Sequence, residues 1–271
     1  MSELRDADVI LSHRYDGGAD YWTTPDRRLL KGSPFSAYQS ALMLLELGMK
    51  PNESVLKETA DLFFEAWRED GRFKLYPKGT AYPCQTAHAV NLLCNMGYVD
   101  DERIQTTLRY LLETRHSDGG WRCNNTTYGR GPETECSNPF PTLIALNAFR
   151  FSDYLNKDDT LDSAVGFLLE HWTIRNPIGP CHYGIGTLFM QVEYPFYSYN
   201  LFMYVYVLSF YNRAKKDKRF LEALTALESK MEGGKIVVER VVPKLAKLDF
   251  CRKGAPSELG TRRYQEIIGR L

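Results

Sequence analysis

Hydrophobic residues recur along most of the chain at the spacing of an α-helix. In residues 101–112, Ile104, Leu108 and Leu111 fall on one face of such a helix, and polar residues fall on the other. This pattern is typical of an amphipathic helix that packs one side against a core. The same pattern predicts amphipathic helices in several further stretches: about residues 3–12, 55–67, 161–172 and 220–231.

Stretches that are apolar nearly all round alternate with the amphipathic ones. Residues 142–149 form the clearest example, and a helix of this kind should be buried on every side. Each such stretch follows a proline, which fits the first turn of a helix because an N–H there has no intrahelical partner. The predicted helix starts are at Pro34, Pro83, Pro139, Pro195 and Pro256.

Glycine turns separate the two kinds of helix. Residues 118–121 read Asp-Gly-Gly-Trp, and residues 70–73 and 232–235 carry related sequences. Glycine supplies the positive φ that commonly ends a helix. A helix pair of this kind cannot cover its own apolar faces, so copies must pack side by side in an open solenoid or a closed ring.

The two ends of the chain favour the ring. The chain starts on an amphipathic helix and finishes on a helix of the buried kind, so the two can complete a last pair, whereas an open solenoid would end in polar caps. We therefore predict an all-α protein with a single domain over residues 1–271. Its predicted architecture is an α/α toroid (barrel) of about five helical hairpins, with an inner and an outer helix ring. Pairing of the N-terminal outer helix with the C-terminal inner helix would close it, and residues 235–242 could add a short strand or hairpin arm.

Composition and charge argue against several classes of protein. Lys plus Arg and Asp plus Glu both number 34, so the net charge is zero, which does not suit a general nucleic-acid or membrane-surface binder. No apolar run approaches the length of a membrane span. Six cysteines without an export signal predict a cytoplasmic protein whose thiols are free or bound to metal.

These features make the chain resemble the α/α-toroid superfamily of protein prenyltransferase β subunits and squalene or oxidosqualene cyclases. Repeats of that superfamily carry an Asp-Gly-Gly-Trp or Asp-Gly-Gly-Phe turn after the outer helix, as residues 118–121 do here. The chain is most similar to uncharacterised bacterial and archaeal prenyltransferase/squalene-cyclase-repeat proteins. In those proteins a cysteine follows the turn, as Cys123 does, and a Gly-x-Pro-Ser sequence opens the last helix, as at residues 254–257.

The resemblance implies a protein that binds a hydrophobic ligand, an isoprenoid or isoprenoid diphosphate, in an aromatic cavity on the ring axis. If the protein is an enzyme, the resemblance implies a prenyl transferase or a terpenoid cyclase-like activity. The Asp-x-Asp-Asp acid with which triterpene cyclases begin their reaction does not occur in the sequence. The alternative is a non-catalytic toroid that binds a peptide or protein partner at the mouth, the end of the ring where the long loops gather.

Chain direction places the loops that follow the amphipathic helices at the mouth, beside the N-termini of the buried helices, which favour anions. Each kind of residue near the mouth also has an explanation without function. Aromatic residues there could simply pack the core, and basic residues could simply be solvent-exposed charges. A buried histidine is often only a hydrogen-bonded core residue. The candidate ligand contacts are Tyr38, Tyr197 and Tyr199 in the first turns of buried helices, and Arg122 and Arg130 in a mouth loop; His88 is the candidate general acid or base.

Possible zinc ligands come from the same loops. Cys123, Cys136, Cys181 and His182 lie in two of them. Protein prenyltransferases, which the chain resembles, draw their zinc ligands from neighbouring repeats. The short cysteine pair typical of structural zinc sites is missing, and buried thiols without metal are the alternative.

Overall fold

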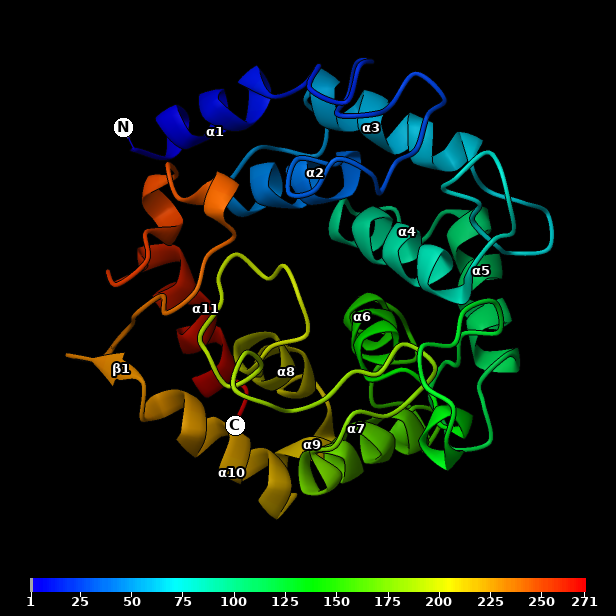
Figure 1. Ribbon diagram of the computed structural model, residues 1–271, viewed down its shortest axis with the longest axis vertical. Helices are drawn as coiled ribbons and strands as arrows, with labels where there is room; N and C mark the ends of the chain where they lie inside the picture. The colour runs from blue at the N-terminus through cyan, green and yellow to red at the C-terminus, as the bar shows by residue number, and fades with distance from the viewer. Residues whose placement is uncertain (1) are drawn as a thin grey trace. The chain divides into compact units, whose positions relative to one another are not determined.

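The computed structural model describes residues 2–271, and nearly all of their regular structure is helical (Figure 1). Contacts divide the chain into two compact units: unit 1 ends at Thr114, and unit 2 comprises Arg115–Leu271. The prediction of an all-α protein is confirmed for the described residues, whereas the single domain and the closed ring stay predictions. None of the helices in residues 2–271 combines the length and apolar character needed to cross a membrane.

Unit 1 arranges its helices in two layers. The second helix packs against the first, third and fourth, and the fourth packs against the third and fifth. The fourth helix is buried along most of its length, whereas the fifth buries chiefly the predicted stripe of Ile104, Leu108 and Leu111. The helices are α1 (Ser2–Ser12), α2 (Ala37–Glu46), α3 (Ser54–Glu65), α4 (Pro83–Asn95) and α5 (Glu102–Glu113).

Unit 2 has the same two-layer plan. Its elements are α6 (Pro139–Phe149), α7 (Asp162–Ile174), α8 (Leu201–Leu208), α9 (Asn212–Lys215), α10 (Lys218–Glu228), α11 (Glu258–Ile268), the strands β1 (Met231–Glu232) and β2 (Lys235–Ile236), and the 3-10 turns η1 (Pro132–Glu135), η2 (Pro243–Leu245) and η3 (Asp249–Cys251). α8 lies between α6 and α11, while α7 packs on α6 and α10 packs on α8. α8 is buried at every position and α6 at all but Phe140, as their apolar sequences predict.

α8 begins later than predicted. It starts at Leu201, with Asn200 as its N-cap, and the Oδ1 of Asn200 accepts a hydrogen bond from the amide of Met203 at 2.9 Å. This side-chain cap, rather than the preceding proline, sets the start of the helix. The prediction that Tyr197 and Tyr199 lie in the first turn was therefore wrong, because both precede the helix.

α2 differs from its prediction in the same way. It begins at Ala37 rather than at Pro34. Its N-cap is Ser36, whose hydroxyl accepts a hydrogen bond from the amide of Gln39 at 3.3 Å. A hydroxyl in this position satisfies an amide that the helix itself leaves without a partner.

The glycine turns make the same contact in both units. In unit 1 the amide of Phe73 donates to the hydroxyl of Thr86 in α4 at 3.1 Å. In unit 2 the amide of Trp121 donates to the hydroxyl of Thr142 in α6, also at 3.1 Å. Each turn is thereby fixed to the first turns of the buried helix that follows it, which supports reading the two sequences as copies of one repeat.

Glycine is required at the second position of each turn for two reasons. Gly71 and Gly119 have φ values of +83° and +92°, which side chains rarely adopt. A Cβ on Gly119 would also lie 2.6 Å from Ser163 of α7, and one on Gly71 would lie 2.8 Å from the Cβ of Tyr110 in α5. The turn therefore packs against the amphipathic helix of the next repeat.

Candidate functional site

Two of the candidate residues, Tyr38 and His88, meet inside unit 1. Their rings pack edge to face with centroids 4.8 Å apart. The hydroxyl of buried Tyr38 accepts a hydrogen bond from Asn91 at 2.8 Å, and Nδ1 of His88 donates to the carbonyl of Cys84 at 2.6 Å. Burial raises the pKa of Tyr38 and lowers the pKa of His88, so both side chains favour their neutral forms.

Asp118 fixes the loop that carries most of the other candidates, loop A (residues 115–138). Its carboxylate accepts hydrogen bonds from the amide and hydroxyl of Ser137 at 2.7 and 2.6 Å, and one from the amide of Gly120 at 3.2 Å. Burial alone would raise the pKa of Asp118, but these hydrogen bonds outweigh it and leave the pKa below its usual value. The aspartate of the turn thus joins the two ends of loop A.

Loop A is bound to the segment between α7 and α8, loop B (residues 175–200, yellow-green in Figure 1). The Oδ1 of Asn138 accepts a hydrogen bond from the amide of Cys181 at 2.9 Å. The amide of Tyr128 donates to the carbonyl of Pro180 at 2.7 Å. These bonds bring together residues that are far apart in sequence.

Cys123 of loop A and Cys181 of loop B interact through their side chains, and we call these two residues the thiol pair. The Cys181 side chain is the main cause of a Cys123 pKa that is lowered to about 5. Burial acts in the opposite direction and raises this pKa. The amides of Asn125 and Thr126 and the charge of Arg122 lower it further. Cys123 is buried and Cys181 is half-buried. At neutral pH the lowered pKa favours the thiolate form of Cys123.

The four predicted zinc ligands do not gather into one site. Burial, with Asp118 as the next cause, raises the pKa of the Cys136 thiol, and His182 pairs with Glu133 through atoms 3.3 Å apart. Among residues 2–271, no group of three or more His, Cys, Asp and Glu side chains has an arrangement that could hold a metal. Structural zinc takes four such ligands, so the residues present do not fit the predicted zinc.

Tyr199 lies in the interior of unit 2. Its hydroxyl donates to Nδ1 of His171 at 2.9 Å, and Nε2 of His171 donates to the carbonyl of Asn176 at 3.2 Å. Burial lowers the pKa of His171 to about 4, so the imidazole is neutral. His171 was not predicted as a site residue, and its position on an amphipathic helix gave no signal for this contact.

Tyr199 belongs to a group of four rings that we call the aromatic cluster. Ring centroids are 4.7 Å apart for Phe189 and Tyr199, 5.6 Å for Phe140 and Tyr183, and 6.1 Å for Tyr183 and Tyr199. Phe140 and Tyr183 are half-buried, whereas Phe189 and Tyr199 are buried. The cluster thus has an inner side that packs the core and an outer side that solvent partly reaches.

Loop B also contains a buried acid that the sequence analysis missed. Glu193 is 1 % exposed and pairs with Arg240 at 3.1 Å, while the hydroxyl of Ser198 donates to both carboxylate oxygens at 2.9 Å. Burial raises the pKa of Glu193 despite these partners. It also raises the pKa of half-buried Tyr197, to which the charge of Glu193 contributes. The only signal in the sequence is an acid within an otherwise apolar stretch.

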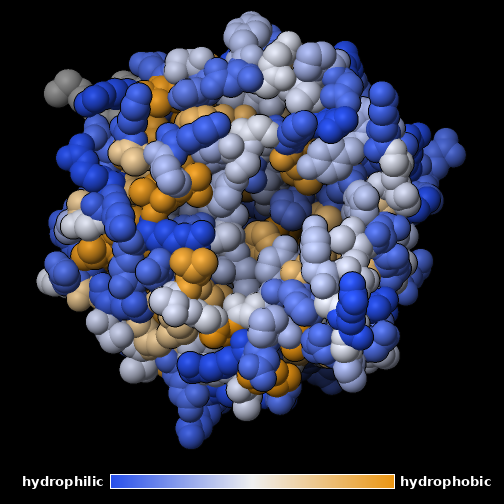
Figure 2. Space-filling model, in the orientation of Figure 1, coloured by the Kyte–Doolittle hydropathy of each residue, from blue (hydrophilic) through white to orange (hydrophobic). Residues whose placement is uncertain are grey.

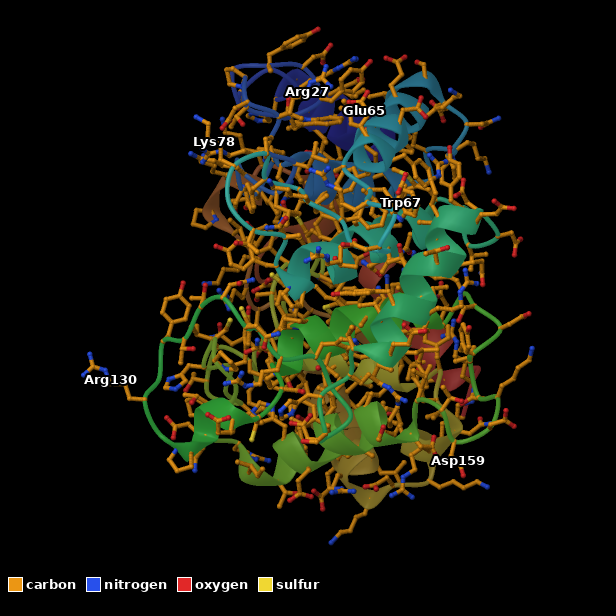
Figure 3. All side chains as sticks on the ribbon, turned by 90° about the vertical axis from the view of Figure 1, so that its right-hand side faces the viewer. Arg27, Glu65, Trp67, Lys78, Arg130 and Asp159 are labelled. Atoms are coloured by element: carbon orange, nitrogen blue, oxygen red, sulfur yellow. The ribbon has the colours of Figure 1, made fainter. Side chains whose placement is uncertain are left out.

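Arg122 and Arg130, both predicted contacts in loop A, have different surroundings. Arg122 is half-buried; its Nε donates to the carbonyl of Thr134 at 3.1 Å, and a terminal nitrogen lies 3.7 Å from Glu135. Arg130 is exposed, and Figure 3 shows its side chain extending away from the loop. Of the two, Arg122 is the one held near the thiol pair.

A second possible site lies within unit 1, an open groove of about 840 Å³ beside the turn at residues 70–73. Its wall includes Trp67, labelled in Figure 3, whose indole N–H donates to Thr107 at 3.2 Å. Charged side chains of both signs complete it: Arg68, Glu69, Asp70, Arg72 and Lys74. On the face in Figure 2, hydrophilic residues cover most of the area and hydrophobic ones form separate patches.

We expect the Cys123 thiol to titrate near pH 5, as measured by the ultraviolet absorbance of the thiolate in the difference between the protein and Cys123→Ala. Cys181→Ala removes the main contact that stabilises this thiolate, so the midpoint should rise toward the ordinary cysteine value. Cys136→Ala serves as the matched control and should leave the midpoint unchanged. A midpoint that stays near pH 5 in Cys181→Ala would show that the second thiol does not stabilise the first.

No protein-family model matches the chain, and no curated protein matches its sequence significantly. Membership of the toroid superfamily therefore stays a proposal that rests on the repeat, the turns and the residues described above.

Proposed function

We propose that the chain is an α/α-toroid protein that binds a hydrophobic ligand of the isoprenoid or isoprenoid diphosphate class, with its main contacts in unit 2. The observation that carries the proposal is the aromatic cluster. Its half-buried rings are Phe140, which directly follows loop A in α6, and Tyr183 of loop B. The same two loops hold Arg122 and the thiol pair. If the protein is an enzyme, the resemblance points to prenyl transfer or terpenoid cyclisation.

The aromatic residues of loop B suit the apolar part of such a ligand. Isoprenoid chains are apolar, and aromatic faces also stabilise positive charge that develops on carbon. Phe140 and Tyr183 offer partly accessible rings, and loop B adds half-buried Tyr197 and exposed Leu188. Tyr199 is buried, so its role is to hold the cluster together from inside.

The anionic part of a diphosphate ligand would bind near the start of α6. The N-terminus of this helix carries partial positive charge, and Arg122 adds a full positive charge in the loop before it. Because Arg122 is held by Thr134, its guanidinium loses little freedom when an anion binds. The exposed side chain of Arg130 extends away from loop A instead.

The two-layer arrangement within each unit supports the toroid part of the proposal. In both units, buried helices alternate with amphipathic ones, and the turn between them bonds to a threonine of the next buried helix. A closed ring would place the N-termini of these buried helices at one end.

Thermal denaturation with geranyl, farnesyl and geranylgeranyl diphosphate tests the proposal. A ligand present at about 100 times its dissociation constant stabilises the folded state by about 2.7 kcal/mol. We expect at least one of these compounds to raise the melting temperature, and Arg122→Gln to reduce the shift. Arg130→Gln removes the same charge from the same loop at an exposed position and should leave the shift unchanged.

The second candidate function is binding of a peptide or protein partner, which the open groove of unit 1 favours because its wall is charged and wide. An absence of any shift with all three diphosphates would overturn the isoprenoid proposal. Peptides that change the fluorescence of Trp67 without any effect of prenyl diphosphates would support the alternative.

A further inference from the structure

Three arginines of unit 2 come together from helices that are far apart in sequence. α8 lies between α6 and α11 (Figure 1). Arg150 is the C-cap of α6, Arg263 lies in α11, and Arg270 follows the C-cap of α11. We call these three residues the arginine cluster.

Two aromatic rings from the end of α8 hold the arginine cluster together. The guanidinium carbons of Arg150, Arg263 and Arg270 lie 5.5, 5.6 and 5.8 Å from the ring centre of Tyr206. Those of Arg270 and Arg150 also lie 3.8 and 4.5 Å from the ring centre of Phe210. Stacking on a ring leaves the N–H donors of a guanidinium in its own plane. The rings therefore bring three sets of donors to one place and restrict their movement.

Glu266 of α11 is an acid in contact with the arginine cluster. Its carboxylate accepts hydrogen bonds from Arg263 at 2.7 Å and from the hydroxyl of Tyr206 at 2.9 Å, and it lies 3.5 Å from Arg270. One carboxylate accepts about four hydrogen bonds, whereas three guanidiniums carry about fifteen N–H donors. The partial negative charges of the helix C-termini offset part of the remaining charge. Relative to Glu266, the cluster keeps an excess of positive charge and of donors.

The arginine cluster is partly shielded from water but still accessible. The side chains of Arg263 and Arg270 are 23 % and 25 % exposed, and Arg150 is half-buried. Burial is the main cause of a lowered pKa of Arg150, and the positive charges of Arg263 and Arg270 lower this pKa further. Charges interact more strongly where water is partly excluded. An anion that enters the cluster would therefore relieve the repulsion among its members.

We propose that the arginine cluster binds a phosphate dianion, supplied either as inorganic phosphate or as the terminal group of a phosphate monoester. A phosphate monoester carries about 1.5 to 2 negative charges at neutral pH and has three acceptor oxygens. The planar fork of a guanidinium fits two of these oxygens at once. A carboxylate brings one charge and two oxygens, so it matches the cluster less well. The net charge of the chain is zero, which favours a small phosphate compound over a nucleic acid.

This site is separate from the one proposed for an isoprenoid diphosphate. The anionic part of that ligand would bind near the start of α6, beside Arg122, whereas Arg150 caps the other end of the same helix. A helix of 11 residues is about 16 Å long. The two proposals therefore concern different arginines and can be tested apart.

Isothermal titration calorimetry of the full-length protein tests the proposal. The probes are inorganic phosphate and phenyl phosphate, with sodium chloride added to keep the ionic strength constant. We expect binding at one site, and we expect Arg270→Gln to weaken it about tenfold or more, because a charge-assisted hydrogen bond to phosphate is lost. Tighter binding of phenyl phosphate would identify a monoester as the ligand, and equal or weaker binding would identify inorganic phosphate.

Two further variants complete the test. Arg150→Gln changes the member of the cluster that comes from α6 and should also weaken binding. Arg252→Gln is the matched control, because this exposed arginine precedes α11 and pairs with Asp249 at 2.6 Å. It should leave the affinity unchanged. If Arg150→Gln does not fold, as measured by circular dichroism, Arg270→Gln decides alone.

Three results would overturn the proposal. The first is the absence of both a binding heat and a rise in melting temperature beyond that in chloride, for both probes. The second is an affinity that the cluster variants leave unchanged, which would show that these arginines only offset the helix ends. The third is binding that Arg122→Gln abolishes, which would place the phosphate at loop A. Because the prenyl diphosphate test depends on Arg122 and this one on Arg270, either proposal can fail while the other stands.

Discussion

Unit 2 should lose about 3 kcal/mol of unfolding free energy through His171 alone as the pH falls from neutral to about 4. His171 is 0 % exposed, and burial lowers its pKa from 6.5 to about 4. In the unfolded chain the imidazole takes up a proton near pH 6.5, whereas in the folded chain it stays neutral until about pH 4. Because the unfolded state binds more protons in this window, the stability is complete above it and is lost as the pH falls through it.

Chemical denaturation at several pH values measures this effect. His171→Gln keeps an acceptor for Tyr199 and a donor for the carbonyl of Asn176, but it does not titrate. The variant should therefore lose less unfolding free energy than the wild type between neutral pH and about pH 4, whatever its stability at neutral pH. Parallel curves for the wild type and His171→Gln would contradict the prediction.

The periodicity of apolar residues predicted most of the helices because the buried face of each helix needs apolar residues at helical spacing. Ile104, Leu108 and Leu111 form the buried stripe of α5, and α6 is buried almost throughout. The start of α8 was mispredicted because proline fits a loop as well as the first turn of a helix. The deciding group is the side chain of Asn200, and only the folded backbone shows that it bonds to an amide.

The candidate site was predicted only in part, because its residues meet through tertiary contacts. The sequence placed Cys123 and Cys181 in mouth loops but did not indicate that they would pair with each other. It treated Arg122 and Arg130 alike, although a bond to Thr134 distinguishes the first. Spacing along a helix carries no information on how two long loops fold against each other.

Glu193 and His171 were missed for a related reason. A polar residue in an apolar stretch breaks the hydrophobic pattern, and its structural role depends on the partner that the fold places beside it. Ser198 and Arg240 supply it for Glu193, and Tyr199 supplies it for His171. Buried polar groups need such partners. The partners of Glu193 and His171 could not be identified from the sequence, because they come from segments that only the fold brings together.

Asp118→Asn should lower the unfolding free energy of unit 2 by about 3 kcal/mol. The carboxylate accepts hydrogen bonds at both oxygens, two from Ser137 and one from the amide of Gly120. An asparagine amide would turn one of these acceptors into a donor that faces another donor. Ser137 is fully buried, so water cannot replace the lost partner and the desolvation cost remains.

Asp70→Asn is the matched control because Asp70 holds the same position in the turn of unit 1. Its carboxylate bonds to Arg72, and its side chain is 48 % exposed, so its loss should cost less than about 1 kcal/mol. Urea denaturation of both variants measures the difference, and equal effects would show that the turn sequence, rather than the burial of its aspartate, sets the contribution.

Acid titration provides a second check on the same residue. Since its hydrogen bonds hold the pKa of Asp118 below the usual value of 3.8, its contribution is complete above that value and is lost as the pH falls through its lower folded pKa. His171 loses its contribution between 6.5 and about 4. Asp118→Asn should therefore flatten the stability curve only at the acid end, while His171→Gln flattens it at higher pH, and the two residues can be told apart in one series of measurements.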